Sequence, residues 1–135
     1  MPHAILTRRE VFSASHRLFS EHLSEAENIA LFGKCFHASG HGHNYVLEVS
    51  VKGPVDKHGL VMNLADLKEA IATHVLSKVD HKHLNLDVEE FHQMNPTAEN
   101  IAIVIWRWLT TALGKALYEV KLHETENNVA IYRGE

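Results

Sequence analysis

The stretch HNYVLEVSVK, residues 43–52, alternates between apolar and polar side chains. From Tyr45 onward one phase is entirely apolar, whereas the other phase carries Glu48, Ser50 and Lys52. Such alternation is typical of a strand in a sheet that has one covered face. Residues 43–52 therefore predict a strand with one face against a core and one polar face.

Two histidines open this strand. His41 and His43 flank Gly42 and lie in phase with the apolar side chains. Because side chains alternate between the faces of a strand, both imidazoles point the same way, roughly 6–7 Å apart at the backbone. Two imidazoles on one face form half of a metal site, although an H-x-H pair by itself is weak evidence of one.

A third histidine completes a candidate metal site. Residues 4–16 predict the first strand, in which His16 shares the phase of Phe12 and Ala14. Three histidine nitrogens with an open fourth position are typical of a catalytic zinc rather than a structural one. His16, His41 and His43 are therefore candidate zinc ligands, and the alternative of three unrelated histidines stays open.

The connection formed by residues 18–34 is predicted to contain a short helix capped by Ser24. Apolar periodicity predicts two longer helices further along the chain. The first is capped by Asn63 and runs to about residue 79, with a buried stripe at Leu64, Leu67, Ile71 and Val75. The second begins at residues 95–100 and ends at Gly114. Residues 80–83 between them are predicted as a polar loop.

Residues 117–124 predict a third strand with Tyr118, Val120 and Leu122 facing inward, and residues 129–133 pair back as a hairpin. The order is β-β-α-α-β-β, which predicts the α+β class with an antiparallel four-stranded sheet and two helices on one face. The whole chain, 1–135, is expected to form one domain. Two sheet edges stay open and need protection or a pairing subunit.

Composition excludes several classes of function. The formal net charge of −4 and a pI of about 6.3 leave no basic face for nucleic acid. The single cysteine rules out an internal disulfide framework and suits a reducing compartment. Neither an apolar signal segment at residues 1–4 nor a bilayer-length apolar run is present, so a cytoplasmic protein without membrane contact is expected.

Three further side chains are candidates for proton transfer. Cys35 follows Gly33-Lys34, and a nearby cation would favour its thiolate, although a lone cysteine is usually a small buried hydrophobe. Asp80 and His81 are either an orienting pair for proton transfer or a surface loop at a helix C-terminus. The sequence leaves both alternatives open.

Glu124 is a candidate for ligand binding. Continued alternation places it on the inward face, where an unpaired carboxylate costs several kcal/mol. A ligand with a planar, guanidine-like edge would satisfy it with two parallel hydrogen bonds. The alternative is a strand that ends at His123, with Glu124 in solvent. Thr97 and Glu99 are most simply helix caps.

Six segments together resemble the 6-pyruvoyl-tetrahydropterin synthase family over nearly the whole chain. They are FSASHRL (12–18), GKC…GHGHNY (33–45), GLVMNLADLK (59–68), VDHKHLN (79–85), PTAEN (96–100) and YEVKLHETENN (118–128). The resemblance implies the T-fold, or tunnelling fold, in which edge strands pair between subunits and two trimers stack into a homohexamer. Such pairing between subunits would cover the two open edges of the sheet.

The resemblance also implies residue roles. His16, His41 and His43 become the Zn²⁺ ligands and Cys35 the general base. Asp80 with His81 becomes a proton relay supplied by the neighbouring subunit. Glu124 becomes the anchor for the pterin, and Thr97 and Glu99 join it as substrate-binding residues.

The substrate that the resemblance implies is 7,8-dihydroneopterin triphosphate, converted to 6-pyruvoyl-tetrahydropterin. A sister group, the 6-carboxytetrahydropterin synthases, acts on the same substrate but releases acetaldehyde as well as triphosphate. The five residues between Cys35 and His41 favour the pyruvoyl group, whereas PTAEN (96–100), His37 and His83 are more typical of the carboxy group. A non-catalytic pterin-binding relative and a carbon–carbon-cleaving sister enzyme are further alternatives, but the latter replaces the cysteine with glutamate.

Overall fold

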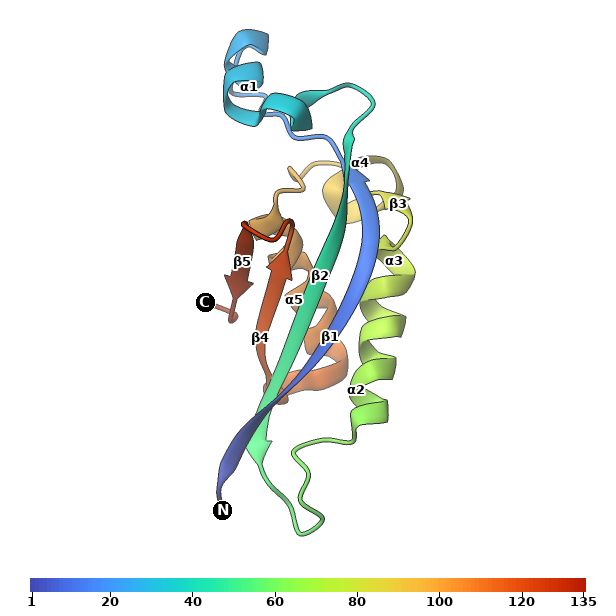
Figure 1. Ribbon diagram of the computed structural model, residues 1–135, viewed down its shortest axis with the longest axis vertical. Coiled ribbons are helices and arrows are strands. Elements are labelled where there is room, and N and C mark those ends of the chain that lie inside the picture. Colours follow the sequence, from blue (N-terminus) through green and yellow to red (C-terminus); the bar gives the residue numbers. More distant parts are fainter.

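The computed structural model describes residues 1–135 as a five-stranded sheet covered by helices (Figure 1). This confirms the predicted α+β class. The order of strands across the sheet is β3-β1-β2-β4-β5. The strands are β1 (His3–His16), β2 (His41–Pro54), β3 (Lys82–His83), β4 (Leu117–His123) and β5 (Val129–Tyr132).

The longest ladder joins β1 to β2 in one unbroken antiparallel register. It runs from His3 opposite Pro54 to His16 opposite His41. Residues directly opposite each other in such a pair lie on the same face of the sheet. His16, His41 and His43 therefore meet at one end of the ladder.

The predicted four-stranded antiparallel sheet is wrong, because β3 adds a fifth strand parallel to β1. The predicted polar loop at residues 80–83 contains this strand. The Asp80 carboxylate accepts a hydrogen bond from the Ser13 amide, and the His81 amide donates to the Ser13 carbonyl. These contacts hold the segment against β1, and a strand of two residues is too short to show any periodicity.

The helices are α1 (Glu25–Phe32), α2 (Leu64–Ile71), α3 (Ser77–Val79), α4 (Leu84–Asp87) and α5 (Ala98–Leu113). Short 3₁₀ turns occupy Gly33–Phe36, Glu89–Phe91 and Gly114–Ala116. α2, α3 and α5 lie against the same face of the sheet, whereas α1 projects from the end at which β2 begins (Figure 1). α1 is the predicted short helix, and Ser24 is its N-cap as expected. The predicted order gains β3 and α4.

A π-helical turn at Ala72–Leu76 joins α2 to α3. The side chains of Leu67, Ile71, Val75 and Val79 are all fully buried and recur every four residues. A regular helix turns every 3.6 residues, so a four-residue repeat drifts around it, and the wider π-turn counters this drift. Leu64 was predicted in the same stripe, but it is 58% exposed because the buried face of α2 starts at Leu67.

One core of apolar side chains lies between the sheet and the helices. The inward row of β2, Tyr45 to Val51, is fully buried and packs with Phe12, Ile101 and Ile105. The prediction for Tyr118 is wrong. The register shifts at Ser50/Val51, so Leu117 is buried instead and the Tyr118 ring contacts Lys52 and Arg133.

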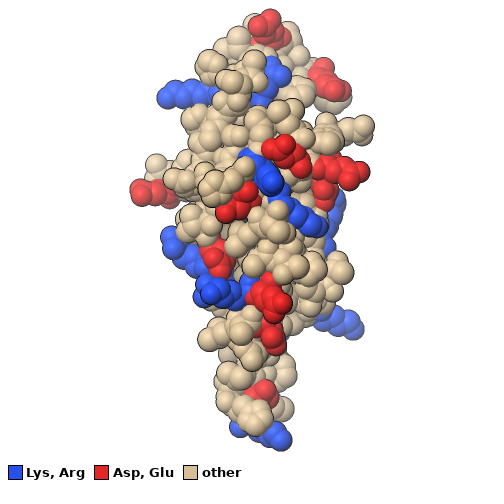
Figure 2. All heavy atoms as spheres, turned by 90° about the vertical axis from the view of Figure 1, so that its right-hand side faces the viewer, with Lys and Arg blue, Asp and Glu red and all other residues tan.

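Acidic and basic side chains are interspersed over the face drawn in Figure 2. No helix combines the length and the apolar character that crossing a bilayer requires.

Candidate active site

Three potential ligand atoms converge where the β1–β2 ladder ends. One atom each from His16, Cys35 and His43 lies within 4.8 Å of the other two. The His16 and His43 rings meet edge to face with their centroids 4.9 Å apart. Residues distant in sequence thus form one cluster of imidazole and thiol groups, which are the ligand types that zinc prefers.

His16 has one ring nitrogen bonded and one free. Its Nδ1 lies 2.8 Å from the Pro96 carbonyl oxygen, whereas its Nε2 is buried without a hydrogen-bond partner. A carbonyl can only accept, so Nδ1 carries the proton and Nε2 presents a lone pair. Burial lowers the pKa of His16 to about 4, with the neighbouring histidines adding to the effect. A neutral imidazole with a free Nε2 fits a metal ligand.

His43 shares the free Nε2 and the lowered pKa of His16. Its Nε2 is buried without a hydrogen-bond partner, and burial followed by the proximity of His41 lowers its pKa. The His41 ring lies 4.7 Å from the His43 ring, centroid to centroid. The three predicted ligands are therefore neighbours, although Cys35 rather than His41 completes the tightest group.

Cys35 reaches the cluster through a 3₁₀ turn that follows α1. The helix ends at Gly33, whose φ of 55° suits glycine, and the Cys35 carbonyl accepts a hydrogen bond from the Leu18 amide. This bond ties the cysteine to the chain just after His16. Burial raises the pKa of the Cys35 thiol, and the Glu124 carboxylate raises it further. The chain alone therefore keeps the thiol protonated, whereas a nearby cation was predicted to favour the thiolate.

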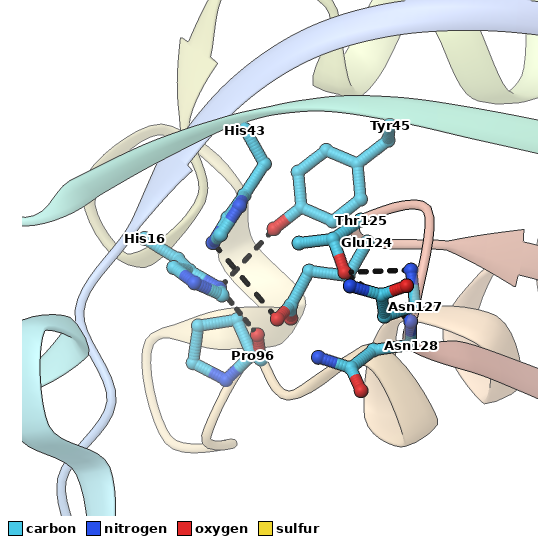
Figure 3. A network of polar contacts seen from close by, with 8 residues as sticks. All are labelled: His16, His43, Tyr45, Pro96, Glu124, Thr125, Asn127 and Asn128. Carbon is cyan, nitrogen blue, oxygen red and sulfur yellow. Dashed lines mark hydrogen bonds and ion pairs between the residues drawn. The ribbon is translucent and has the colours of Figure 1, made fainter.

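Glu124 points toward the cluster (Figure 3). Strand β4 ends at His123, yet the Glu124 side chain is only 16% exposed and lies 4.0 Å from His43 Nε2. The following turn fixes this direction, because the Thr125 hydroxyl accepts hydrogen bonds from the amides of Asn127 and Asn128. Burial, followed by the charge of Glu99, raises the pKa of Glu124. This carboxylate has no cationic side chain of the chain as a partner.

Asp80 and His81 lie elsewhere in the chain. They form a pair, with His81 Nδ1 3.0 Å from the Asp80 carboxylate, beside the outer edge of β1. His81 adopts a φ of 61° and its side chain is 82% exposed. No contact joins this pair to the cluster within one chain.

The segment 95–99 borders the cluster at the start of α5. The Thr97 hydroxyl accepts a hydrogen bond from the Asn100 amide, so this residue is the N-cap that the sequence suggested. Glu99 is exposed in the first turn of α5, and its charge lies near enough to raise the pKa of Glu124.

Sequence reasoning missed Tyr45 and Pro96. The Tyr45 hydroxyl lies 3.2 Å from His16 Nδ1, on the face that holds His43. A hydroxyl at the end of an otherwise aliphatic buried row needs a partner, which is a signal that the sequence carried. Pro96 acts through its backbone carbonyl, for which side-chain patterns give no signal.

Comparisons with known proteins agree with this geometry. The family model described as 6-pyruvoyl tetrahydropterin synthase matches residues 5–135. The 6-pyruvoyl tetrahydrobiopterin synthase of Drosophila melanogaster is 52% identical over 98% of this chain and 81% of its own length. A putative 6-carboxy-5,6,7,8-tetrahydropterin synthase of Archaeoglobus fulgidus is 36% identical, over 84% of this chain and 91% of the relative.

The same similarity extends to three dimensions. The solved structure of Caenorhabditis elegans 6-pyruvoyl tetrahydropterin synthase superposes with a TM-score of 0.94 at 44% identity, covering 100% of this chain and 98% of that one. The family model, the Drosophila melanogaster relative and the solved structure all span nearly the whole chain. The chain therefore belongs to the 6-pyruvoyl tetrahydropterin synthase family.

Proposed function

We propose that this chain is a lyase that converts 7,8-dihydroneopterin triphosphate to 6-pyruvoyl-5,6,7,8-tetrahydropterin and eliminates triphosphate. Its relatives from Drosophila melanogaster and Homo sapiens, 52% and 48% identical, are named 6-pyruvoyl tetrahydrobiopterin synthases. The observation that carries the proposal is the pair of buried, unpartnered nitrogens His16 Nε2 and His43 Nε2 beside the Cys35 thiol.

His16, His41 and His43 would hold a zinc ion in this proposal. The fit rests on the neutral imidazoles and the free Nε2 atoms of His16 and His43. When bound, zinc supplies positive charge that polarises the hydroxyls of the substrate side chain and favours the Cys35 thiolate.

Cys35 then removes a proton from the substrate side chain, and Glu124 holds the pterin. The mostly buried Glu124 carboxylate accepts two parallel hydrogen bonds from the amino-pyrimidine edge, which offsets the cost of removing its charge from water. Thr97 and Glu99 border this position at the start of α5. Substrate orientation therefore comes from Glu124, and proton abstraction comes from Cys35.

In this proposal Asp80 and His81 belong to a neighbouring copy of the chain, and they return a proton to the substrate. The 82% exposure of the His81 side chain, which makes no hydrogen bond or ion pair with the cluster, supports an active site shared between subunits. The assembly proposed is a homohexamer of two trimers, each chain being a single domain. A cytoplasmic location fits the free thiol of Cys35.

Incubation of the purified protein with 7,8-dihydroneopterin triphosphate tests the reaction. Mass spectrometry of the products should show 6-pyruvoyl-tetrahydropterin and triphosphate, and an acetaldehyde assay should be negative. The archaeal relative gives the second candidate, a 6-carboxytetrahydropterin synthase, for which stoichiometric acetaldehyde is the signature. Binding without turnover would identify a non-catalytic pterin-binding protein and overturn both assignments.

Replacing Glu124 with glutamine should weaken pterin binding by about 10- to 100-fold, because it removes a charged acceptor worth about 1.5–3 kcal/mol. A pterin dissociation constant from fluorescence titration measures this. Glu126→Gln, at an exposed position two residues away, is the matched control and should bind as the unmodified protein does. Equal affinity in Glu124→Gln would mean that the carboxylate does not hold the pterin.

A further inference from the structure

The hydroxyl of Tyr45 is buried in surroundings that are otherwise apolar or belong to the site. Its ring is fully buried, stacks on Phe12 with centroids 4.9 Å apart, and continues the inward row Leu47, Val49 and Val51 of β2. Phenylalanine would fill the same space. The only side chain within hydrogen-bond distance of the hydroxyl is His16, through Nδ1.

We propose that Tyr45 is a positioning residue that, together with the Pro96 carbonyl, fixes the ring orientation and tautomer of His16 for metal binding. This inference rests on the proposed zinc site. Metal-ligating histidines generally donate their second ring N–H to a neighbouring oxygen, which sets which nitrogen binds the metal. Two oxygens, Pro96 O at 2.8 Å and the Tyr45 hydroxyl at 3.2 Å, lie beside His16 Nδ1.

The Pro96 carbonyl determines which atom donates in these hydrogen bonds. Pro96 O can only accept, so the proton stays on His16 Nδ1 and the Tyr45 oxygen is a second acceptor for the same N–H. The tyrosine proton is thereby directed away from His16. Both oxygens favour the tautomer in which Nε2 is free, and Nε2 is the buried atom without a partner.

Packing holds the hydroxyl in place. The Tyr45 ring meets the His16 and His43 rings edge to face, with centroids 6.3 Å and 5.5 Å apart (Figure 3). A rigid ring between Phe12 and the two histidines leaves the hydroxyl little freedom. The Tyr45 hydroxyl therefore acts through His16 and does not need to contact the substrate.

Tyr45→Phe tests the inference because it removes one oxygen and keeps the ring. Competition with a chromophoric chelator should show zinc affinity about tenfold weaker than in the unmodified protein, within the range for loss of such a supporting contact. The visible spectrum of the cobalt-substituted variant should shift. Nitrogen NMR of the metal-free variant should show a larger fraction of the His16 tautomer protonated at Nε2.

Tyr132→Phe is the matched control, because the Tyr132 ring packs on Trp106 away from the cluster. It should leave zinc affinity and the cobalt spectrum unchanged. Equal zinc affinity and equal spectra in Tyr45→Phe and the unmodified protein would overturn the role of Tyr45. Absence of zinc binding in the unmodified protein would instead overturn the proposed metal site.

Discussion

Replacing Cys35 with alanine is expected to lower turnover by about 10²- to 10⁴-fold, the range that a positioned general base contributes. The thiol lies within 4.8 Å of ligand atoms of His16 and His43 and close enough to Glu124 for that carboxylate to raise its pKa. It is therefore beside both the proposed metal ligands and the proposed pterin anchor. Steady-state kinetics with 7,8-dihydroneopterin triphosphate measure the loss.

Zinc content and pterin affinity of Cys35→Ala separate two roles. If Cys35 is a base and not a metal ligand, Cys35→Ala should still contain about one zinc per chain. Its pterin dissociation constant should equal that of the unmodified protein. Loss of zinc together with turnover would make Cys35 a metal ligand, an arrangement that the tight His16–Cys35–His43 group also permits. Full turnover would contradict either role. Cys35→Ser is the conservative control, since a hydroxyl at this position stays protonated and should be equally inactive.

Replacing His43 with alanine is expected to abolish zinc retention. His43 presents a buried, unpartnered Nε2, so its removal leaves the ion with too few ligands for a stable tetrahedral site. The affinity should fall by more than the roughly 100-fold limit for changes outside the ligand set. Metal analysis after dialysis against a weak chelator measures this.

His58→Ala controls for loss of a histidine, because His58 lies in an exposed turn and should retain zinc fully. His41→Ala identifies the third ligand. Zinc loss in His41→Ala but not in Cys35→Ala would support the three-histidine set. Full zinc content in His43→Ala would exclude this cluster as the metal site.

Alternation was enough to predict which strand residues of the candidate site lie on the same face of the sheet. The phase of His16, His41 and His43 follows from apolar partners along β1 and β2, and the unbroken register preserves it. Glu124 was reached by extending the same alternation from β4, and it points inward although the strand ends one residue earlier.

Features that depend on single hydrogen bonds or on local irregularities could not be predicted. β3 is held by the Asp80 carboxylate and the Ser13 backbone, and two residues have no periodicity. The bulge that turns Tyr118 out of the core leaves no mark in the pattern. The approach of Cys35 to His16 depends on where a 3₁₀ turn after α1 returns the chain.

The pairing of His16 with His41 closes the β1–β2 ladder, so the chain between them is formally one long hairpin loop. The strand register therefore sets the backbone spacing of His16, His41 and His43. Residues 17–40 lie outside this ladder, so insertions or deletions there would leave the backbone spacing intact and would change the path that brings Cys35 to the cluster. In such a layout the position of the proposed base can change without any change in the strands that carry the three proposed metal ligands.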